Sequence, residues 1–154
     1  MKTKFAIGCL VQWYECDIIE EYIDSLKDAM SKYEGQVIVD VTIVGNQDLE
    51  KCTSEEQLDK CIKKIESICN FGNVRYTDDL HTIADYRRGF LEQYNDQVDV
   101  LIQGESDALM PKQTFIVLDM LHQQVKDSTP KYIATFGINK MWDASWKPLE
   151  HVEF

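Results

Sequence analysis

The sequence lacks the signatures of two large protein classes. No apolar run approaches the ~18 residues that a membrane-spanning helix needs. Basic residues are few, since 16 Lys and Arg stand against 27 Asp and Glu and leave a net charge of -11. Nucleic-acid binding depends on clustered Lys and Arg, so this balance argues against a nucleic-acid partner. An anionic ligand would need a metal ion or a local basic group to offset the negative field.

Several catalytic and nucleotide-binding motifs are absent as well. The chain has neither the glycine fingerprint of a Rossmann dinucleotide site nor a GxxxxGK[ST] phosphate loop. It also lacks a GxSxG nucleophile elbow, so hydrolysis through an activated serine has little support. Ser106 has no histidine near it in the sequence, and we interpret it as a packed or turn-bonding hydroxyl.

Cysteines are present without the spacing of a disulfide or zinc framework. The chain has five, an odd number, and no CxxC pair: Cys9, Cys16, Cys52, Cys61 and Cys69. Reduced cysteines are typical of cytosolic proteins, so we expect a cytoplasmic location.

Strands and helices are predicted to alternate along the whole chain. At 154 residues with 44% hydrophobic residues, the sequence fits one domain with a sizeable core. Apolar and β-branched runs predict strands, and apolar residues at helical spacing predict helices between them. The strands are expected at residues 4–11, 37–44, 74–77, 98–103 and 131–138, and the helices at 18–33, 53–70, 82–94 and after Pro111. This pattern predicts an α/β fold, a mostly parallel sheet with helices on both faces.

Some details of these elements are also predicted. The first apolar run is too short for a signal peptide and fits a core strand. Asp17 is expected to cap the first helix, and Thr53 or Ser54 the second. The helix after Pro111 should bury one apolar side, formed by Phe115, Ile116, Leu118, Leu121 and Val125.

The acidic pair Glu105 and Asp107 follows the fourth predicted strand. Side chains alternate along a strand, so these two carboxylates are expected to point the same way and Ser106 the other way. Mg²⁺ and Mn²⁺ take oxygen ligands and commonly bind one or two carboxylates together with substrate phosphates. The pair therefore suggests a nucleotide-diphosphate site. The alternative is that both acids are solvated loop residues beside a turn.

Several segments together resemble the family 2 glycosyltransferases, which have the GT-A fold. The matching segments are the Gln12-Trp13-Tyr14-Glu15 loop, the helix with Glu20, Glu21 and Ser25-Leu26, Tyr86-Arg87-Arg88-Gly89-Phe90, and the run from Val100 to Pro111 with Glu105-Ser106-Asp107. In that family an Arg-containing helix precedes a strand that ends in a DxD motif, which holds a divalent cation against the diphosphate of a nucleotide sugar.

The resemblance implies a set of site residues. Glu105 and Asp107 would hold Mn²⁺ or Mg²⁺. Gln12, Trp13 and Tyr14 would line the nucleoside pocket, with Asp85 and Arg88 in support. Arg87 or Arg88 would meet the diphosphate, although only one of two helical neighbours can face it. The implied reaction is transfer of a sugar from a nucleotide diphosphate donor to an acceptor hydroxyl.

The chain departs from the family in two places. Gly45-Asn46-Gln47 follows the second strand where the family often has acids that grip the base. The sequence also ends at Phe154, before the half that carries the acceptor site. We therefore expect a donor-binding half that self-associates, with Trp142 and Trp146 either forming a sugar platform or left without cover. His151 matches only in type the late metal-binding histidine of some GT-A enzymes.

Two other functions fit the same elements. A nucleotidyltransferase also needs metal-binding carboxylates on a related sheet, but it is expected to have a glycine-rich basic loop after strand one, where this chain has Trp13 and Glu15. A catalytically inert binding or assembly module is permitted by the short length and by Glu105 in place of the first Asp of DxD.

Overall fold

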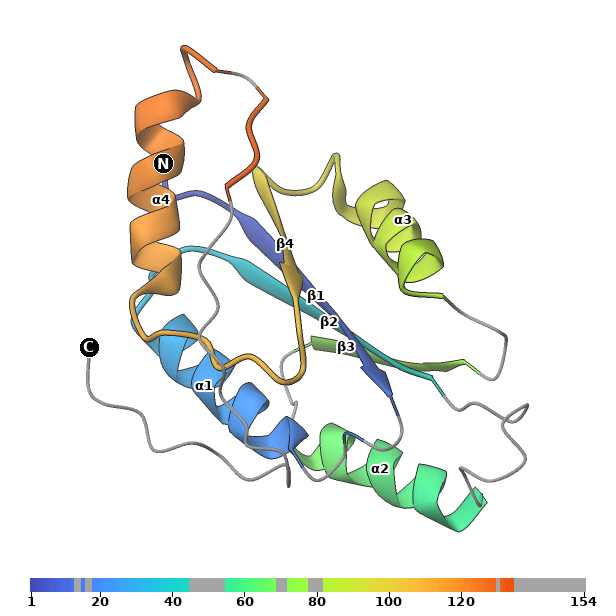
Figure 1. Cartoon of the computed structure of the whole chain (residues 1–154). Coiled ribbons are helices and arrows are strands. Elements are labelled where there is room, and N and C mark those ends of the chain that lie inside the picture. Colours follow the sequence, from blue (N-terminus) through green and yellow to red (C-terminus); the bar gives the residue numbers. More distant parts are fainter. Residues whose placement is uncertain are drawn as a thin grey trace.

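The fold is α/β, as the alternating pattern predicts. The computed structural model describes residues 1–12, 15, 18–44, 55–68, 72–77, 82–129 and 131–134. In this part of the chain, four strands form one parallel sheet in the order β3-β2-β1-β4 (Figure 1). The strands are β1 (Phe5–Gln12), β2 (Val37–Val44), β3 (Gly72–Thr77) and β4 (Val100–Gly104). The helices are α1 (Ile19–Ser31), α2 (Glu55–Ile68), α3 (Ile83–Tyr94) and α4 (Thr114–Val125).

The larger core lies between the sheet and three helices. Side chains alternate along a strand, so the odd-numbered residues of β1 and of β2 share one face. That face packs against α1, α2 and α4 through Phe5, Ile7, Cys9, Val11, Val39, Val41, Ile43, Ile23, Leu26, Ile65 and Phe115. Both strands are almost entirely buried, which accounts for their nearly unbroken apolar sequences.

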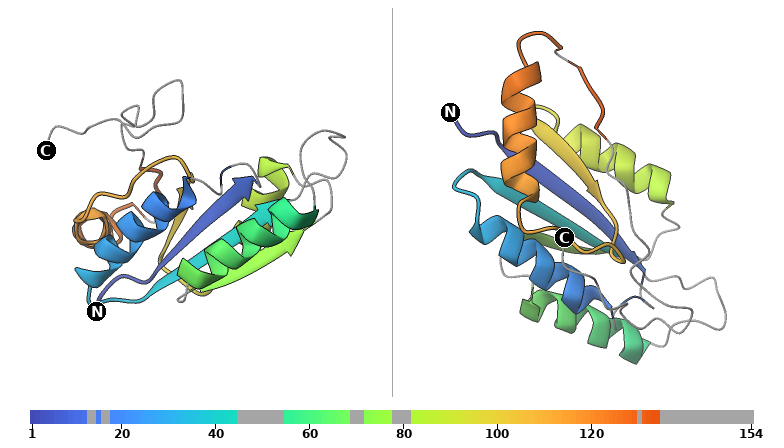
Figure 2. Two further views of the ribbon diagram at one scale, coloured as in Figure 1. Left: turned by 90° about the horizontal axis from the view of Figure 1, so that it is seen from below. Right: turned by 60° about the vertical axis from the view of Figure 1, so that its left-hand side comes forward.

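Helix α3 covers the other face of the sheet. Its buried aromatic residues Tyr86, Phe90 and Tyr94, each one helical turn apart, pack on Ala6. The sheet thus lies between α3 and the other three helices (Figures 1 and 2). On this face Asp40 is fully buried, and its carboxylate accepts a hydrogen bond of 2.8 Å from the Tyr94 hydroxyl.

The strand order creates a switch point between β1 and β4. From β1 the chain proceeds to β2 and then β3 on one side, whereas β4 returns to the opposite side of β1. In open parallel sheets, ligands bind at the carboxyl ends of the strands at such a point. The β4 strand is short, and its last residue Gly104 lies beside Cys9, while β1 continues to Gln12.

Three details of the expected elements are wrong. Residues 131–134 form no strand and Ile133 is 94% exposed, which removes the described part of the fifth strand; residues 135–138 lie outside the described chain. The N-cap of α1 is Ile18, without a side-chain cap hydrogen bond, instead of Asp17. In α4 Phe115 and Leu118 are buried, but Ile116 is exposed, because the buried stripe of this helix is narrower than its apolar sequence.

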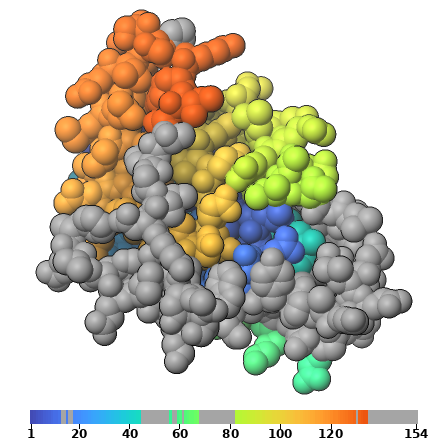
Figure 3. Space-filling view, viewed as in Figure 1, coloured from blue at the N-terminus to red at the C-terminus, as the bar shows by residue number. Residues whose placement is uncertain are grey.

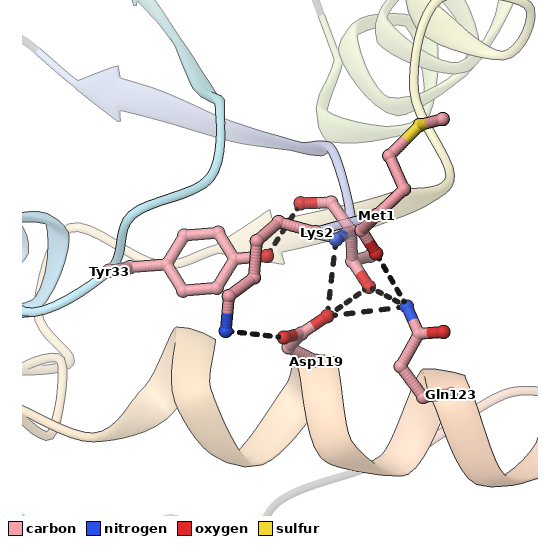
Figure 4. Close-up of polar contacts among 6 residues, drawn as sticks. Met1, Lys2, Tyr33, Asp119 and Gln123 are labelled. Carbon is pink, nitrogen blue, oxygen red and sulfur yellow. Dashed lines mark hydrogen bonds and ion pairs between the residues drawn. The ribbon is translucent and has the colours of Figure 1, made fainter.

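A polar cluster joins the N-terminal residues to α4. The Asp119 carboxylate is buried and accepts hydrogen bonds from the backbone N–H of Thr3 at 3.1 Å and from its hydroxyl at 2.5 Å (Figure 4). Lys2 and Gln123 also donate to this carboxylate, and the Tyr33 hydroxyl donates to the Thr3 carbonyl at 2.7 Å. The hydrogen bond from the Thr3 hydroxyl is the main reason that the pKa of Asp119 is lowered to about 2.

We expect Asp119→Ala to lower the free energy of unfolding by about 1–3 kcal/mol, because the buried donors of Thr3 lose their acceptor. The unfolded carboxyl has a pKa of about 3.9 and the folded one about 2. The contribution is therefore present in full above about pH 4 and is lost as pH falls through 2. Urea unfolding at pH 7 and at pH 2 measures this, with the exposed Asp127→Ala as control. Equal stability of parent and Asp119→Ala at pH 7 would contradict it.

None of the described helices is both long enough and apolar enough to cross a membrane.

Candidate ligand site at the carboxyl edge of the sheet

Glu15, which follows β1, and Ser106, which follows β4, are hydrogen-bonded to each other near the switch point. Gly104 pairs with Cys9, so β4 ends beside β1 three residues before β1 itself ends at Gln12. Figure 3 shows atoms of β1, in blue, reaching the surface between α3, in yellow-green, and the segment after β4, in gold. The edge that the strand order marks as a ligand site is therefore lined by these elements.

Glu105 and Asp107 lie in a turn, not at the end of a strand. β4 ends at Gly104, and the backbone N–H of Ala108 donates to the Glu105 carbonyl at 3.1 Å, closing the 105–108 turn. These residues therefore do not continue the strand, so strand alternation is not what sets the directions of their side chains. The prediction that Glu105 lies at the same edge of the sheet as Gln12 is nevertheless confirmed. Glu105 directly follows β4, and the carboxyl ends of the parallel strands β4 and β1 lie on the same side.

The 105–108 turn is anchored on both sides. The Ser106 side chain is buried at 4% exposure, while Asp107 is exposed. Two residues beyond the turn, the backbone N–H of Met110 donates to the Ser25 hydroxyl of α1 at 2.9 Å. These contacts fix the backbone of the turn and leave the carboxylate of Asp107 at the surface.

Glu15 adds a third carboxylate to this edge. Its Oε2 accepts a hydrogen bond of 2.6 Å from the backbone N–H of Gln12, and its carboxylate is also hydrogen-bonded by Ser106. Burial raises the pKa of Glu15, as do the charges of Asp107 and Glu105, although the two hydrogen bonds oppose this. Three acidic groups thus act on one another across the two loops.

Arg87 supplies a positive charge at the same place. Its Nη2 lies 2.6 Å from Oε1 of Glu105, an ion pair that links α3 to the 105–108 turn. Arg87 is placed by α3, whose N-terminus is fixed by a capping box between Thr82 and Asp85. Arg88 is directed elsewhere, with its Nη1 3.9 Å from Asp85 and a side chain 69% exposed.

The position of Gly104, just before the 105–108 turn, has no room for a side chain. A Cβ at this position would lie 2.6 Å from the Tyr22 hydroxyl and 3.2 Å from the Gly8 carbonyl oxygen. A Cβ contact of 2.6 Å is essentially never seen, so any larger residue would displace the Tyr22 side chain of α1 or the turn itself.

Cys9 lies on the buried side of this edge. Burial is the main cause that raises the pKa of its thiol well above the usual value, and the charge of Glu15 raises it further. A thiol in such surroundings is a poor nucleophile, because the thiolate is the reactive form.

We therefore expect alkylation of Cys9 by iodoacetamide at pH 8 to be at least about tenfold slower in the folded protein than in urea, since reaction requires opening of the core. Mass spectrometry that resolves each cysteine measures the rates. Equal rates for Cys9 in the two conditions would show that the thiol is accessible.

The structure brings together only part of the site predicted from sequence. Gln12 ends β1 and its backbone contacts Glu15. Asp85 and Arg88 pair with each other at the start of α3, while Arg87 contacts Glu105. Trp13 and Tyr14, the other two expected nucleoside-pocket residues, lie outside the described residues, as do Trp142, Trp146 and His151.

Glu15 is a residue of this edge that was not among the site residues predicted from the sequence. Its signal was its position, since it is an acidic residue shortly after a buried strand, on the edge where ligands bind.

The carboxylates offer hard oxygen ligands but no complete metal cage. Within the described ranges, no group of three or more His, Cys, Asp or Glu side chains is placed to hold a metal ion. Mg²⁺ and Mn²⁺ do not need one, because they keep bound water and bind through one or two carboxylates plus substrate phosphates. The donor set therefore fits a divalent cation that arrives with a phosphate ligand.

Comparisons of the chain with family models, with curated proteins and with solved structures find no match.

Proposed function

We propose that the carboxyl edge of β1 and β4 binds a nucleotide diphosphate sugar together with Mn²⁺ or Mg²⁺, and that the protein is a glycosyltransferase of the GT-A type or its donor-binding portion. One observation carries the proposal. The 105–108 turn, with two carboxylates, and Arg87 of α3 meet at the switch point of a parallel sheet. Opposite charges side by side on a ligand-binding edge suit a phosphate group with its cation.

The charges at the edge support a cation in particular. Burial is the main cause that raises the pKa of Glu15, and the charges of Asp107 and Glu105 raise it further, so a cation at this edge would relieve part of the unfavourable negative charge. Asp107 and Glu105 would hold the ion, and the remaining ligands would be water and the diphosphate. When bound, the ion neutralises the charge that develops on the leaving diphosphate.

The chain's own residues would then orient the donor. Arg87 would contact the diphosphate, because a guanidinium can donate two parallel hydrogen bonds to phosphate oxygens. Gln12, Trp13 and Tyr14 would line the nucleoside pocket at the end of β1. An acceptor hydroxyl would attack the anomeric carbon as the bond from that carbon to the diphosphate breaks.

Calorimetry with UDP, GDP, CDP and ADP, each with and without Mn²⁺, tests the binding part of the proposal. We expect one of the four to bind in the micromolar range with Mn²⁺ and at least about tenfold more weakly without it. If none binds better with Mn²⁺ than without it, the proposal is wrong.

An activity assay separates the alternatives. A glycosyltransferase is expected to release nucleoside diphosphate slowly from its donor in a metal-dependent reaction. A nucleotidyltransferase would instead release pyrophosphate from a nucleoside triphosphate and a sugar 1-phosphate. A binding module would bind the donor and catalyse neither reaction.

A further inference from the structure

The Arg87–Glu105 ion pair occupies both groups that a metal–diphosphate ligand would need. Arg87 Nη2 is 2.6 Å from Glu105 Oε1. In the proposed site, Glu105 binds the cation and Arg87 the phosphate, yet in this structure each is bound to the other. The two arrangements compete, because the guanidinium holds Oε1 and neutralises the carboxylate charge that would otherwise attract a metal ion.

The ion pair is weak enough to exchange. Both side chains are more than two-fifths exposed, at 44% and 43%. Ion pairs in such positions contribute little, since water screens them and two long side chains must be ordered. This pair has one Nη2–Oε1 bond, whereas a phosphate can accept two parallel bonds from Arg87 and a divalent cation brings two positive charges to Glu105.

The exchange needs no movement of the backbone. Arg87 lies in the second turn of α3, behind the capping box at Thr82. The 105–108 turn is closed by its own hydrogen bond and held through Met110 to Ser25. Rotation of two exposed side chains is therefore sufficient.

We infer that Arg87 and Glu105 form an exchangeable pair that couples cation binding to diphosphate binding. Without ligand, Arg87 neutralises Glu105 and competes with free cations. When the diphosphate arrives with its cation, Glu105 transfers to the cation and Arg87 to the phosphate. The inference deepens the proposed function and rests on it. It makes the site selective for a metal–diphosphate complex over the metal alone.

Two titrations of Arg87→Gln test the inference, because the coupling predicts shifts of opposite sign. Affinity for Mn²⁺ alone, measured by calorimetry, should rise about fivefold, the effect of removing one weak competing pair. Affinity for the nucleoside diphosphate at saturating Mn²⁺ should fall at least about tenfold, the effect of losing a charged hydrogen bond. Arg87→Lys, which keeps the charge but not the paired donors, should lie between parent and Arg87→Gln in both titrations.

Two further variants control for charge. Arg88→Gln removes the same charge from the residue next to Arg87, and the Arg88 side chain contacts Asp85 instead of Glu105. This variant therefore measures the general electrostatic effect on Mn²⁺ affinity. Lys126→Gln removes a charge just beyond α4, at the opposite edge of the sheet. We expect the effects of both on the Mn²⁺ titration to be smaller than that of Arg87→Gln.

Several outcomes would overturn the inference. The first is a rise in Mn²⁺ affinity in Arg88→Gln as large as that in Arg87→Gln. The second is that the Mn²⁺ affinity and the nucleoside diphosphate affinity of Arg87→Gln shift in the same direction. The third is that neither affinity of Arg87→Gln shifts while its melting temperature falls. The last would make the pair a structural contact only. Failure of the proposed function is distinguishable, because the parent protein would then bind no diphosphate with Mn²⁺.

Discussion

Asp107→Asn is expected to abolish Mn²⁺-dependent nucleotide binding while the melting temperature stays the same or rises. The carboxylate is exposed at the ligand edge, and an amide is a far weaker ligand for a divalent cation. We expect the affinity for the nucleoside diphosphate with Mn²⁺ to fall to its metal-free value, a loss of at least about tenfold. Stability should not suffer, because Asp107 adds to the repulsion on the Glu15 carboxylate.

Asp127→Asn is the matched control for this variant. Asp127 is equally an exposed acid in a turn, but it follows α4 at the opposite edge of the sheet. Calorimetry and thermal unfolding of the two variants separate ligand binding from a general change of charge. Equal Mn²⁺-dependent affinity in Asp107→Asn and the parent would remove Asp107 from the site.

Gly8→Ala is expected to have the largest effect on stability, a loss of about 3 kcal/mol. A Cβ on Gly8 would lie 2.6 Å from the Tyr86 hydroxyl and 2.7 Å from Cδ2 of Phe90. Tyr86 cannot easily retreat, because its hydroxyl is 3.2 Å from the Asp40 carbonyl and Phe90 packs beside it. The added methyl would therefore push α3 away from the sheet.

Gly89→Ala is the opposite case in the same helix. An added Cβ there meets nothing within 4 Å, and alanine is favoured over glycine inside a helix by about 1 kcal/mol. We expect this variant to be more stable than the parent by that amount. Urea unfolding of both variants measures the difference, and a Gly8→Ala protein as stable as Gly89→Ala would show that α3 does not pack on Gly8.

The central elements of the fold could be predicted because their sequences carry a strong signal. The β1 and β2 strands are buried on both faces, so they read as nearly continuous apolar runs. The prediction of the fifth strand is wrong for its described residues, because Tyr132 and Ile133 have side chains that favour strands but residues 131–134 form no strand. Hydrophobic periodicity shows which side chains of a segment could be buried. It does not show whether a partner strand lies beside the segment, because that depends on the tertiary structure.

The candidate site could be predicted only as a location. The ends of parallel strands share one edge of a sheet, so the sequence correctly predicted that Glu105 lies at the same edge as Gln12. Which arginine meets the carboxylates depends on the rotation of α3 about its axis, and a helix turns by about 100° from Arg87 to Arg88. The bond from Gln12 to Glu15 is set by the path of the chain after β1, which no periodic pattern encodes.

Paramagnetic broadening of amide NMR signals by Mn²⁺, in the presence of the nucleoside diphosphate that binds, tests the central claim most directly. Mg²⁺ provides the diamagnetic reference. If the ligand site lies at the switch point, the signals of Gln12, Arg87, Gly104 and Asp107 will broaden first, while those of Thr3, Asp119 and Gln123 at the opposite edge remain sharp. Broadening centred on Asp119, or spread evenly over the described residues, would contradict a ligand site between β1 and β4.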